Sequence, residues 1–276
     1  MNAASEEATT PVGDALRGVA EAQLSQAADF LARKGGHRHS GVHQGRKSIR
    51  RVRSILTLAA VPLGPGADAL NHLLSAINQD LSRSRDAQAL VEAIDHFAAR
   101  TRNGKWLALL ARARKNAVSA RRVVLQEAMA ADPDFMQART LLMQTRDALG
   151  ALPWIGVTVQ EVEAAFSTGR KQTRKAAARA AATHDDEDWH RWRRKARRQS
   201  QQQKILAEVG IASHVRYDDK GIALLLGQQQ DCSLLLAFCE TEQSPIRWTD
   251  RNQLNHYIGK KLRSLRKKLA GQSVHA

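Results

Sequence analysis

Apolar residues recur every three or four positions along almost the whole chain, which is the spacing of one face of an α-helix. Residues 12–34, for example, carry Leu16, Val19, Leu24 and Leu31 at such intervals. The alternation of apolar and polar residues that would indicate β-strands is scarce, and alanine, the strongest helix former, is abundant. The sequence therefore predicts an all-α protein.

Glycine, proline and capping residues divide this pattern into separate helices. The chain is expected to break at 35–36, 62–66 and 103–104, and residues 210–221 are expected to form mostly loop. Asp132 followed by Pro133 is a helix start signal, and Thr158 with Glu161 has the spacing of a capping box. The expected helices cover 12–34, 40–60, the neighbourhoods of 70–77 and 90–97, 106–129, 132–150, a stretch after 158, a stretch that starts at 184–188, two helices within 224–240, and 249–269.

A basic stripe that begins with a histidine occurs twice. Arginine follows His43 at +3, +7 and +8, and it follows His190 at the same three intervals. On a helix, positions +3 and +7 lie nearly below the histidine, so each stripe stacks like charges, which destabilises a free helix. The apolar residues of the first copy, such as Ile49 and Val52, fall on the opposite face. Two such rows suggest a polyanion that neutralises them.

The repeat extends beyond the stripes. Asp86 follows His43 by 43 residues, and Asp231 follows His190 by 41. This order predicts two related helical bundles that face each other across a pseudo-twofold axis. We expect a disordered N-terminus at 1–11 and one domain at 12–270, made of halves at about 12–150 and 155–270. The two aspartates are interpreted as structural residues that hold arginines or cap helices.

The positive charge belongs to both halves. The chain has 43 Lys and Arg against 27 Asp and Glu, a net charge of +16. Residues 1–150 contribute 21 basic and 14 acidic residues, and the rest contributes 22 and 13, so no basic tail is the source. Candidate partners are nucleic acid, an anionic membrane or another polyanion.

The remaining sequence signals favour a cytoplasmic protein. Cys232 and Cys239, seven residues apart on an expected helix, are too distant to form a disulfide and are read as buried thiols. The polar N-terminus does not resemble a signal peptide. No apolar run is expected to approach the roughly 18 residues that a membrane-spanning helix needs.

Four segments, in order, resemble the CHAD family, the conserved-histidine α-helical domain. They are residues 42–53 (VHQGRKSIRRVR), 84–90 (SRDAQAL), 189–194 (WHRWRR) and 226–231 (LGQQQD). The resemblance extends over about residues 12–269. The second stripe departs from the family after Arg198, where glutamines and a serine occupy 199–203, so a weaker grip is expected from that half.

The resemblance implies a pair of four-helix bundles around a basic central cavity, binding of inorganic polyphosphate, and association with polyphosphate granules in bacteria. Arginine suits this ligand because its planar group gives phosphate two hydrogen bonds at once. The predicted polyphosphate-binding residues are His43, Arg46, Lys47, Arg50, Arg51 and Arg53 of the first stripe, His190, Arg193, Arg194, Arg197 and Arg198 of the second, and Lys260, Lys261, Arg263, Arg266, Lys267 and Lys268 of the last helix. About half of the last group is expected to face solvent.

Other interpretations stay open at this stage. A basic helical face is often simply a solvated surface, and each histidine could orient a neighbouring arginine instead of contacting the ligand. General DNA binding is the alternative function, although aromatic residues for base stacking are few. The acidic stretch 185–188 is the one dense candidate for a catalytic metal, but its position at a helix start explains it structurally. We therefore expect no enzymatic activity, no metal, no cofactor and no membrane binding.

Overall fold

The protein is described by a computed structural model that covers residues 11–211, 220–241, 244 and 246–273. Every regular element in these ranges is helical, which confirms the predicted all-α class. The α-helices are α1 (Val12–Leu31), α2 (Arg38–Leu58), α3 (Ala60–Leu63), α4 (Pro65–Asp80), α5 (Ser82–Ala99), α6 (Gly104–Ala131), α7 (Met136–Gly150), α8 (Val159–Thr183), α9 (Asp186–Glu208), α10 (Lys220–Glu240) and α11 (Trp248–Ser273). Three short 3₁₀ turns, η1 (Gly35–His37), η2 (Pro133–Phe135) and η3 (Trp154–Gly156), connect them.

Most predicted boundaries agree with the structure, and the differences have local causes. The capping box is present, because Thr158 and Glu161 exchange side-chain and backbone hydrogen bonds. Asp132 does cap, but its carboxylate accepts from backbone N–H groups of α7, across the intervening η2 turn. The break at 62–66 contains the one-turn helix α3, and the two helices predicted within 224–240 are a single helix, α10. Most of the predicted loop at 210–221 and of the predicted disordered N-terminus lies outside the described residues.

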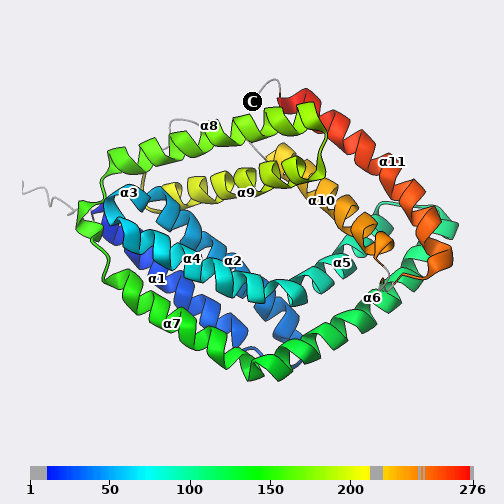
Figure 1. The fold of residues 1–276 in the computed structure, drawn as a ribbon, viewed down its shortest axis with the longest axis horizontal. Coiled ribbons are helices and arrows are strands. Elements are labelled where there is room, and N and C mark those ends of the chain that lie inside the picture. The colour runs from blue at the N-terminus through cyan, green and yellow to red at the C-terminus, as the bar shows by residue number, and fades with distance from the viewer. Residues whose placement is uncertain (1–10, 212–219, 242–243, 245, 274–276) are drawn as a thin grey trace, which may run out of the picture.

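The helices form a ring with an inner and an outer layer (Figure 1). Neighbours in sequence pack as pairs: α1 with α2, α5 with α6, α8 with α9, and α10 with α11. In each pair one helix, namely α2, α5, α9 or α10, lies on the inner side of the ring. These inner helices also contact one another, α2 with both α5 and α9, and α10 with both α5 and α9.

The hydrophobic core is shared between the two sequence halves. One cluster of buried residues joins α1, α2, α4 and α7 to α8 and the end of α9. A second joins α5 and α6 to α10 and α11, and a third, which includes Trp189 and Trp192, joins α8 and α9 to α10 and α11. The packing therefore crosses residue 150, and the division into two pseudo-symmetric bundles stays a prediction.

The packing of α2 against α1 sets the direction of the first basic stripe. Ile49 and Val52 are fully buried, as their place opposite the stripe predicted. At Gly41 the two helices are so close that a Cβ atom would lie 2.2 Å from the backbone oxygen of Phe30. Because only glycine permits this contact, α2 is fixed with its basic face toward the inside of the ring.

The helix α10 corrects the sequence analysis on one point. Its segment Gly221–Glu240 has a mean hydropathy of 1.3 and is long and apolar enough to cross a membrane by length and composition. This segment is not a continuous apolar run, because neutral glutamines and a serine interrupt it, yet its mean hydropathy stays high. Core helices pass the same test, and α10 packs against α5, α9 and α11.

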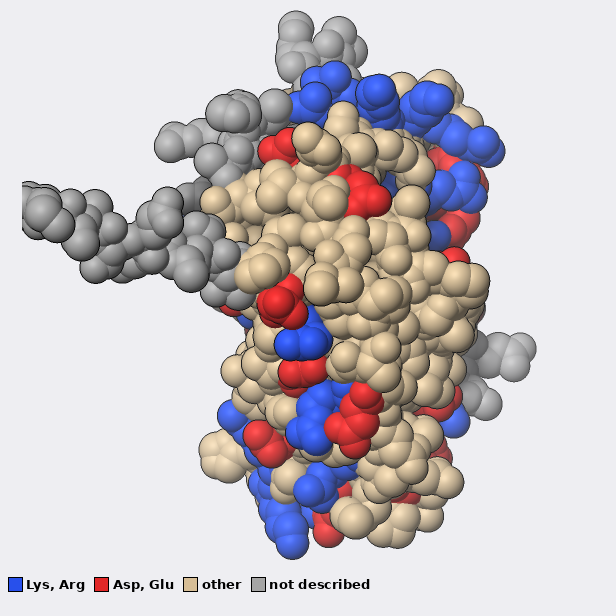
Figure 2. Space-filling model, turned by 90° about the vertical axis from the view of Figure 1, so that its left-hand side faces the viewer, with Lys and Arg blue, Asp and Glu red and all other residues tan. Residues whose placement is uncertain are grey.

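The side of the molecule where α1, α3 and the start of α8 meet is poor in charge over its middle (Figure 2). Lys and Arg gather instead along the top of this view, at the level of α8, and near the bottom. Two apolar residues of elements in this region, Val61 of α3 and Ile155 of η3, are among the most exposed hydrophobic side chains described. The middle of this side therefore offers few cations to a polyanion.

Candidate functional site

A basic cavity of about 380 Å³ lies between the inner helices α2, α5, α9 and α10. We call it the central cavity. Its lining contains eight arginines and two histidines against three carboxylates: Arg46, Arg50, Arg53, Arg85, Arg193, Arg194, Arg197, Arg198, His43 and His190, with Asp86, Glu92 and Asp231. Histidine-led stripes that are 147 residues apart in sequence thus line one site.

The first stripe divides between the cavity and the outer surface. Four of its six predicted members line the cavity, namely His43, Arg46, Arg50 and Arg53. Lys47 is exposed and does not line it. Arg51 forms an ion pair with Glu208 at the end of α9 and also lies outside the lining. Helical spacing alone does not explain this, because the residues at the same +4 and +8 intervals from His190, Arg194 and Arg198, do line the cavity.

The second stripe enters the cavity completely. The lining includes all five predicted members: His190, Arg193, Arg194, Arg197 and Arg198. Trp189 and Trp192 lie on the opposite face of α9 and are buried. The glutamines after Arg198 also have defined roles, because Gln202 donates from Nε2 to the backbone oxygen of Ser54 on α2 at 3.2 Å.

None of the six cations of the last helix lines the central cavity, so their expected place there is wrong, while their part in polyphosphate binding stays a prediction. Arg266 is paired with Asp186 at the start of α9, and its guanidinium lies 5.6 Å from the ring centroid of Trp189. Lys260, Lys261 and Lys268 line a different cavity, described below. The two others, Arg263 and Lys267, are exposed. The helix α11 packs against α8 and α10, and the sequence alone did not indicate which helices it would contact.

Arg85 is a cavity residue that the site prediction omitted. It lies on α5, directly before Asp86, in the Arg-Asp element that the sequence analysis did single out. Arg85 forms an ion pair of 2.9 Å with Glu92, about two helical turns further along α5. The repeat was a usable signal, since Asp231 marks the equivalent place on α10 and also lines the cavity.

Several cavity arginines have no acidic partner. Within the described residues, Arg50, Arg193, Arg197 and Arg198 form no ion pair. Burial, followed by repulsion from Arg197, lowers the pKa of Arg50 to about 9, and the same two causes lower the pKa of Arg193 to about 9. Both groups are still cationic at neutral pH, so the free cavity holds repelling charges.

Other cavity arginines are held by neutral oxygens. Arg46 donates to the backbone oxygen of Asn78 at the end of α4. Arg53 donates from Nε to Oδ1 of Asn71, also on α4, at 2.9 Å. Neutral acceptors position a guanidinium without cancelling its charge, so these two side chains stay available to an anion.

Both histidines sit among cations. Burial, followed by repulsion from Arg85, lowers the pKa of His43. Burial, followed by repulsion from Arg194 and Arg193, lowers the pKa of His190. His43 Nδ1 is buried and has no hydrogen-bond partner among the described residues. The free cavity therefore favours neutral imidazoles, and an anion placed between them would favour protonation.

The two repeated aspartates differ from their predicted roles. Asp231 Oδ2 pairs with Nδ1 of His96 at 2.8 Å, not with an arginine. Asp86 forms no ion pair with any described residue, and it lies inside α5, not at its start. Burial raises the pKa of Asp86, against the opposing attraction of Arg46 and Arg85. The carboxylates therefore lower the positive potential of the central cavity but do not neutralise it.

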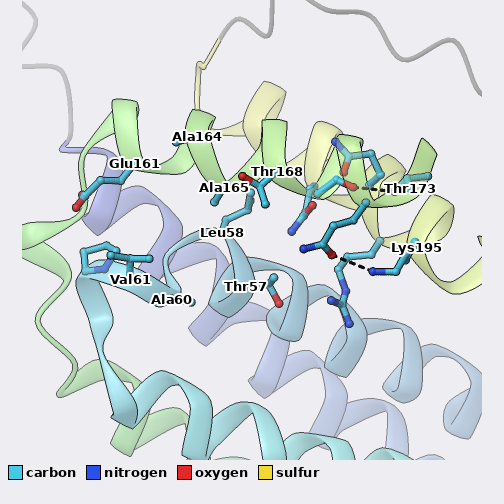
Figure 3. A pocket seen from close by; sticks show the side chains of 16 residues that line it. Thr57, Leu58, Ala60, Val61, Glu161, Ala164, Ala165, Thr168, Thr173 and Lys195 are labelled. Atoms are coloured by element: carbon cyan, nitrogen blue, oxygen red, sulfur yellow. Dashed lines mark hydrogen bonds between the residues drawn. The ribbon is translucent and has the colours of Figure 1, made fainter. Parts of the chain in front are cut away.

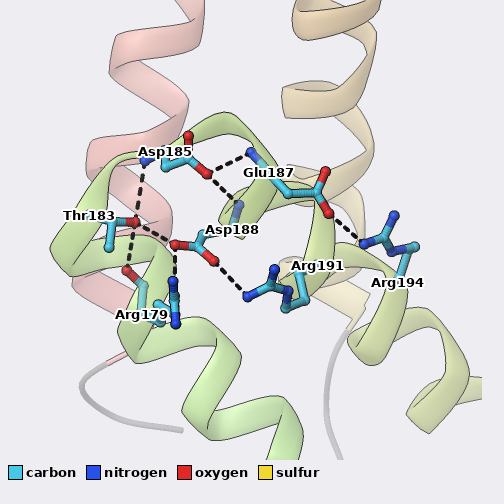
Figure 4. Close-up of polar contacts among 7 residues, drawn as sticks. All are labelled: Arg179, Thr183, Asp185, Glu187, Asp188, Arg191 and Arg194. Carbon is cyan, nitrogen blue, oxygen red and sulfur yellow. Dashed lines mark hydrogen bonds and ion pairs between the residues drawn. The ribbon is translucent and has the colours of Figure 1, made fainter.

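The acidic stretch at the start of α9 forms a network of ion pairs at the edge of the cavity (Figure 4). Asp185 caps the helix, and its carboxylate accepts from the backbone N–H groups of Glu187 and Asp188. Asp188 pairs with Arg179 at 2.9 Å and with Arg191 at 3.1 Å. This arrangement agrees with the structural role predicted for the stretch, since each of its carboxylates either caps the helix or forms an ion pair.

A second cavity, of about 410 Å³, lies beside the central one, between the end of α2, α3, α8 and α9 (Figure 3). Arg198 lines both cavities. At this end Lys195 donates to Oε1 of Gln172 on α8 at 2.9 Å. The rest of the lining is largely apolar, with Leu58, Val61 and Ala165 among its members. Arg198 therefore lies at the boundary between the basic central cavity and this second cavity.

Comparisons with known proteins agree with this architecture. The family model of the CHAD domain matches residues 18–240. PptA from Streptomyces chartreusis is similar in structure, with a TM-score of 0.67 and 16% identity over 97% of this chain and 100% of that one. The CHAD domain from the plant Ricinus communis has a TM-score of 0.62 and 18% identity over 97% of this chain and 94% of that one. No curated protein matches the chain. At these identities the two solved structures show a shared fold.

Proposed function

The chain belongs to the CHAD family, and we propose that it binds inorganic polyphosphate in the central cavity without cleaving it. The observation that carries this proposal is the cluster of Arg50, Arg193, Arg197 and Arg198, which line one cavity and lack ion pairs among the described residues. Repelling cations in a confined space cost stability. A flexible polyanion relieves that cost, so the site is built for a ligand with many negative charges.

The chemistry of the lining fits condensed phosphate. Polyphosphate carries about one negative charge per phosphate, and each guanidinium gives a phosphate two hydrogen bonds. From His43 to Arg53 the stripe spans about 15 Å at 1.5 Å per residue, which is long enough for several phosphates. The facing stripe on α9 focuses the potential from the other side, which raises the local concentration of anions.

The geometry favours polyphosphate over DNA. The arginines lie in a cavity of about 380 Å³ between four helices, not on a convex face that could enter a DNA groove. None of the described residues that line it is Phe, Tyr or Trp, so the cavity lacks the large aromatic rings on which bases stack best. DNA would have to be held by exposed cations outside the cavity, in a weak and salt-sensitive manner.

We further propose that the role is capture, not catalysis, with a cytoplasmic location at polyphosphate granules. Enzymes that transfer or hydrolyse phosphoryl groups use carboxylates to hold metal ions. Here two of the three cavity carboxylates are paired, Glu92 with Arg85 and Asp231 with His96, and the third, Asp86, is attracted by Arg46 and Arg85. A phosphate-release assay with Mg²⁺ or Mn²⁺ tests this point, since steady release from long-chain polyphosphate would contradict it. A fluorescent fusion that stays diffuse in granule-containing bacteria would contradict the location.

A competition titration tests the binding proposal directly. Long-chain polyphosphate and duplex DNA are compared at equal phosphate concentration and about 0.15 M salt, where weak surface attraction is screened. Tight polyphosphate binding that DNA does not displace supports the central cavity as the site. Equal competition, or an advantage for DNA, would mean that the stripes act as a general polyanion surface.

A further inference from the structure

The last helix places its lysines in a cavity of its own. This cavity, of about 520 Å³, is lined by residues of α11, α10 and the end of α5, and we call it the lysine cavity. Four cations line it: Arg100, Lys260, Lys261 and Lys268. Lys260, Lys261 and Lys268 are among the residues predicted from sequence to bind polyphosphate, but the sequence did not place them in a separate cavity.

The cations of the lysine cavity share one face of α11. Lys260, Lys261, Ser264 and Lys268 are separated by steps of one, three and four residues, so they point to the same side of the helix. From Lys260 to Lys268 this face spans about 12 Å. The hydroxyl groups of Ser264 and Tyr257 add hydrogen-bond donors to the same lining. The site thus offers both charge and directed donors.

The positive charge of the lysine cavity is largely uncompensated. Its one carboxylate, Asp231, is already paired with His96 at 2.8 Å. In the part of the chain that the structure describes, no ion pair involves Arg100 or the three lysines. Lys261 instead lies 5.7 Å from the ring centroid of Tyr257. An anion is therefore the natural complement of this lining.

The lysine cavity adjoins the central cavity. Asp231 on α10 lines both of them. The helix α5 also runs from one to the other, since Glu92 lines the central cavity and Arg100, two turns later, lines the lysine cavity. The His96–Asp231 pair lies between these two positions of α5. A ligand that leaves the central cavity along α5 would meet the lysines next.

We propose that the lysine cavity binds condensed phosphate, as a second site beside the central cavity. This inference rests on the proposed function for the nature of the ligand but not for the site itself. The phosphates can come from two sources: a distal part of the chain held in the central cavity, or a separate short oligophosphate. Both sources present the same linked, multiply charged groups to the lysines.

The experiment uses isothermal titration calorimetry with two probes, tripolyphosphate and long-chain polyphosphate. The test variant is K260Q/K268Q, and the matched control is K171Q/K175Q, which removes two exposed lysines of α8 that line neither cavity. A third variant, R50Q/R197Q, disables the central cavity. We expect the unmodified protein and the control to bind two tripolyphosphates, and each of the other variants to bind one.

The long chain separates the two sources. In one outcome the unmodified protein binds only one tripolyphosphate, and K260Q/K268Q loses affinity for long-chain polyphosphate by about fivefold or more. This outcome means that the lysine cavity binds the distal part of a chain held in the central cavity. Loss of the second tripolyphosphate assigns it to a separate oligophosphate. If K260Q/K268Q matches K171Q/K175Q with both probes, the inference is wrong. If R50Q/R197Q binds long chains as tightly as the unmodified protein while K260Q/K268Q does not, the proposed function fails and this inference stands.

Discussion

Arg194 Nη2 donates to Glu187 Oε1 at 2.7 Å, so an arginine that lines the central cavity is held at its edge by an internal carboxylate. The same pairing lowers the pKa of Glu187. Both side chains are 57% exposed, so the pair is accessible to a competing anion. An anion bound in the central cavity would therefore compete with Glu187 for one guanidinium.

Substitution of Glu187 by glutamine should raise polyphosphate affinity by about twofold, because an exposed ion pair contributes only about 0.2–1 kcal/mol. The control is Glu163→Gln, an exposed glutamate of α8 that lies outside the cavity lining. Titration calorimetry at about 0.15 M salt measures the difference. An affinity of E187Q that equals or falls below that of E163Q would show that Arg194 does not contact the ligand.

Removal of a central cation should weaken binding without unfolding the protein. Arg50→Gln and Arg197→Gln should each lower polyphosphate affinity about tenfold or more, since a hydrogen bond to a charged group contributes about 1.5–3 kcal/mol. The melting temperature of the free protein should stay the same or rise, because each substitution removes a buried charge that is repelled by its neighbours; burial, followed by repulsion from Arg197, lowers the pKa of Arg50. Unchanged affinity in both variants would exclude the central cavity as the site.

Polyphosphate should stabilise the folded protein, because a ligand that binds only the native state shifts the unfolding equilibrium. At 100 times the dissociation constant the gain is about 2.7 kcal/mol, which corresponds to a rise in melting temperature of about 5–10 °C for a chain of this size. Differential scanning fluorimetry measures it. The R50Q/R197Q variant should show a much smaller rise, and an equal rise would point to binding elsewhere.

Acidification should act in opposite directions on stability and on binding. Because burial lowers the pKa of His43 and of His190, their contribution to stability is fully present above pH 6.5 and is lost as the pH falls toward their folded pKa values. A bound anion raises those pKa values, so polyphosphate affinity should increase from pH 7.5 to pH 5.5. The groups that act on His43 include Arg85, Glu92 and Arg50.

The double variant H43Q/H190Q separates the histidines from the other titrating groups of the cavity. Its melting temperature, measured without ligand, should fall less between pH 7.5 and pH 5.5 than that of the unmodified protein. The gain of affinity over the same interval should also shrink. A gain of affinity identical to that of the unmodified protein would assign the binding effect to Asp86, whose pKa burial raises and whose protonation removes a negative charge from the cavity. An identical fall in melting temperature would contradict the assignment to the histidines, since protonation of Asp86 has the opposite effect on stability.

The close contact of α1 and α2 gives a test of the fold that is independent of any ligand. Gly41→Ala should lower the free energy of unfolding by about 1–3 kcal/mol, because its Cβ atom would overlap the Phe30 carbonyl. Gly18→Ala, on the exposed side of α1 with no atom within 4 Å, should instead raise it by about 0.5–1 kcal/mol. Urea denaturation measures both. Equal effects of the two substitutions would contradict the described helix contact.

The features that depend on neighbouring residues were predictable from sequence. Helical spacing gave the all-α class, and the capping box at Thr158 and Glu161 was identified from three residues of separation. The same periodicity separated Ile49 and Val52, which are buried, from His43, Arg46 and Arg50, which line the cavity. Two helices were predicted where the structure has the single helix α10. Short polar interruptions do not end this helix, because it packs against α5, α9 and α11.

The sequence by itself determined which residues share a helical face, because the α-helix fixes their angular spacing whatever surrounds it. Only the tertiary structure decided which of those faces meet. It turned Lys47 and Arg51 away from the cavity, admitted Arg85 from another helix, and moved Lys260, Lys261 and Lys268 to a cavity of their own. These outcomes depend on contacts between helices far apart in the chain, such as the approach of α2 to α1 at Gly41, which no local pattern encodes.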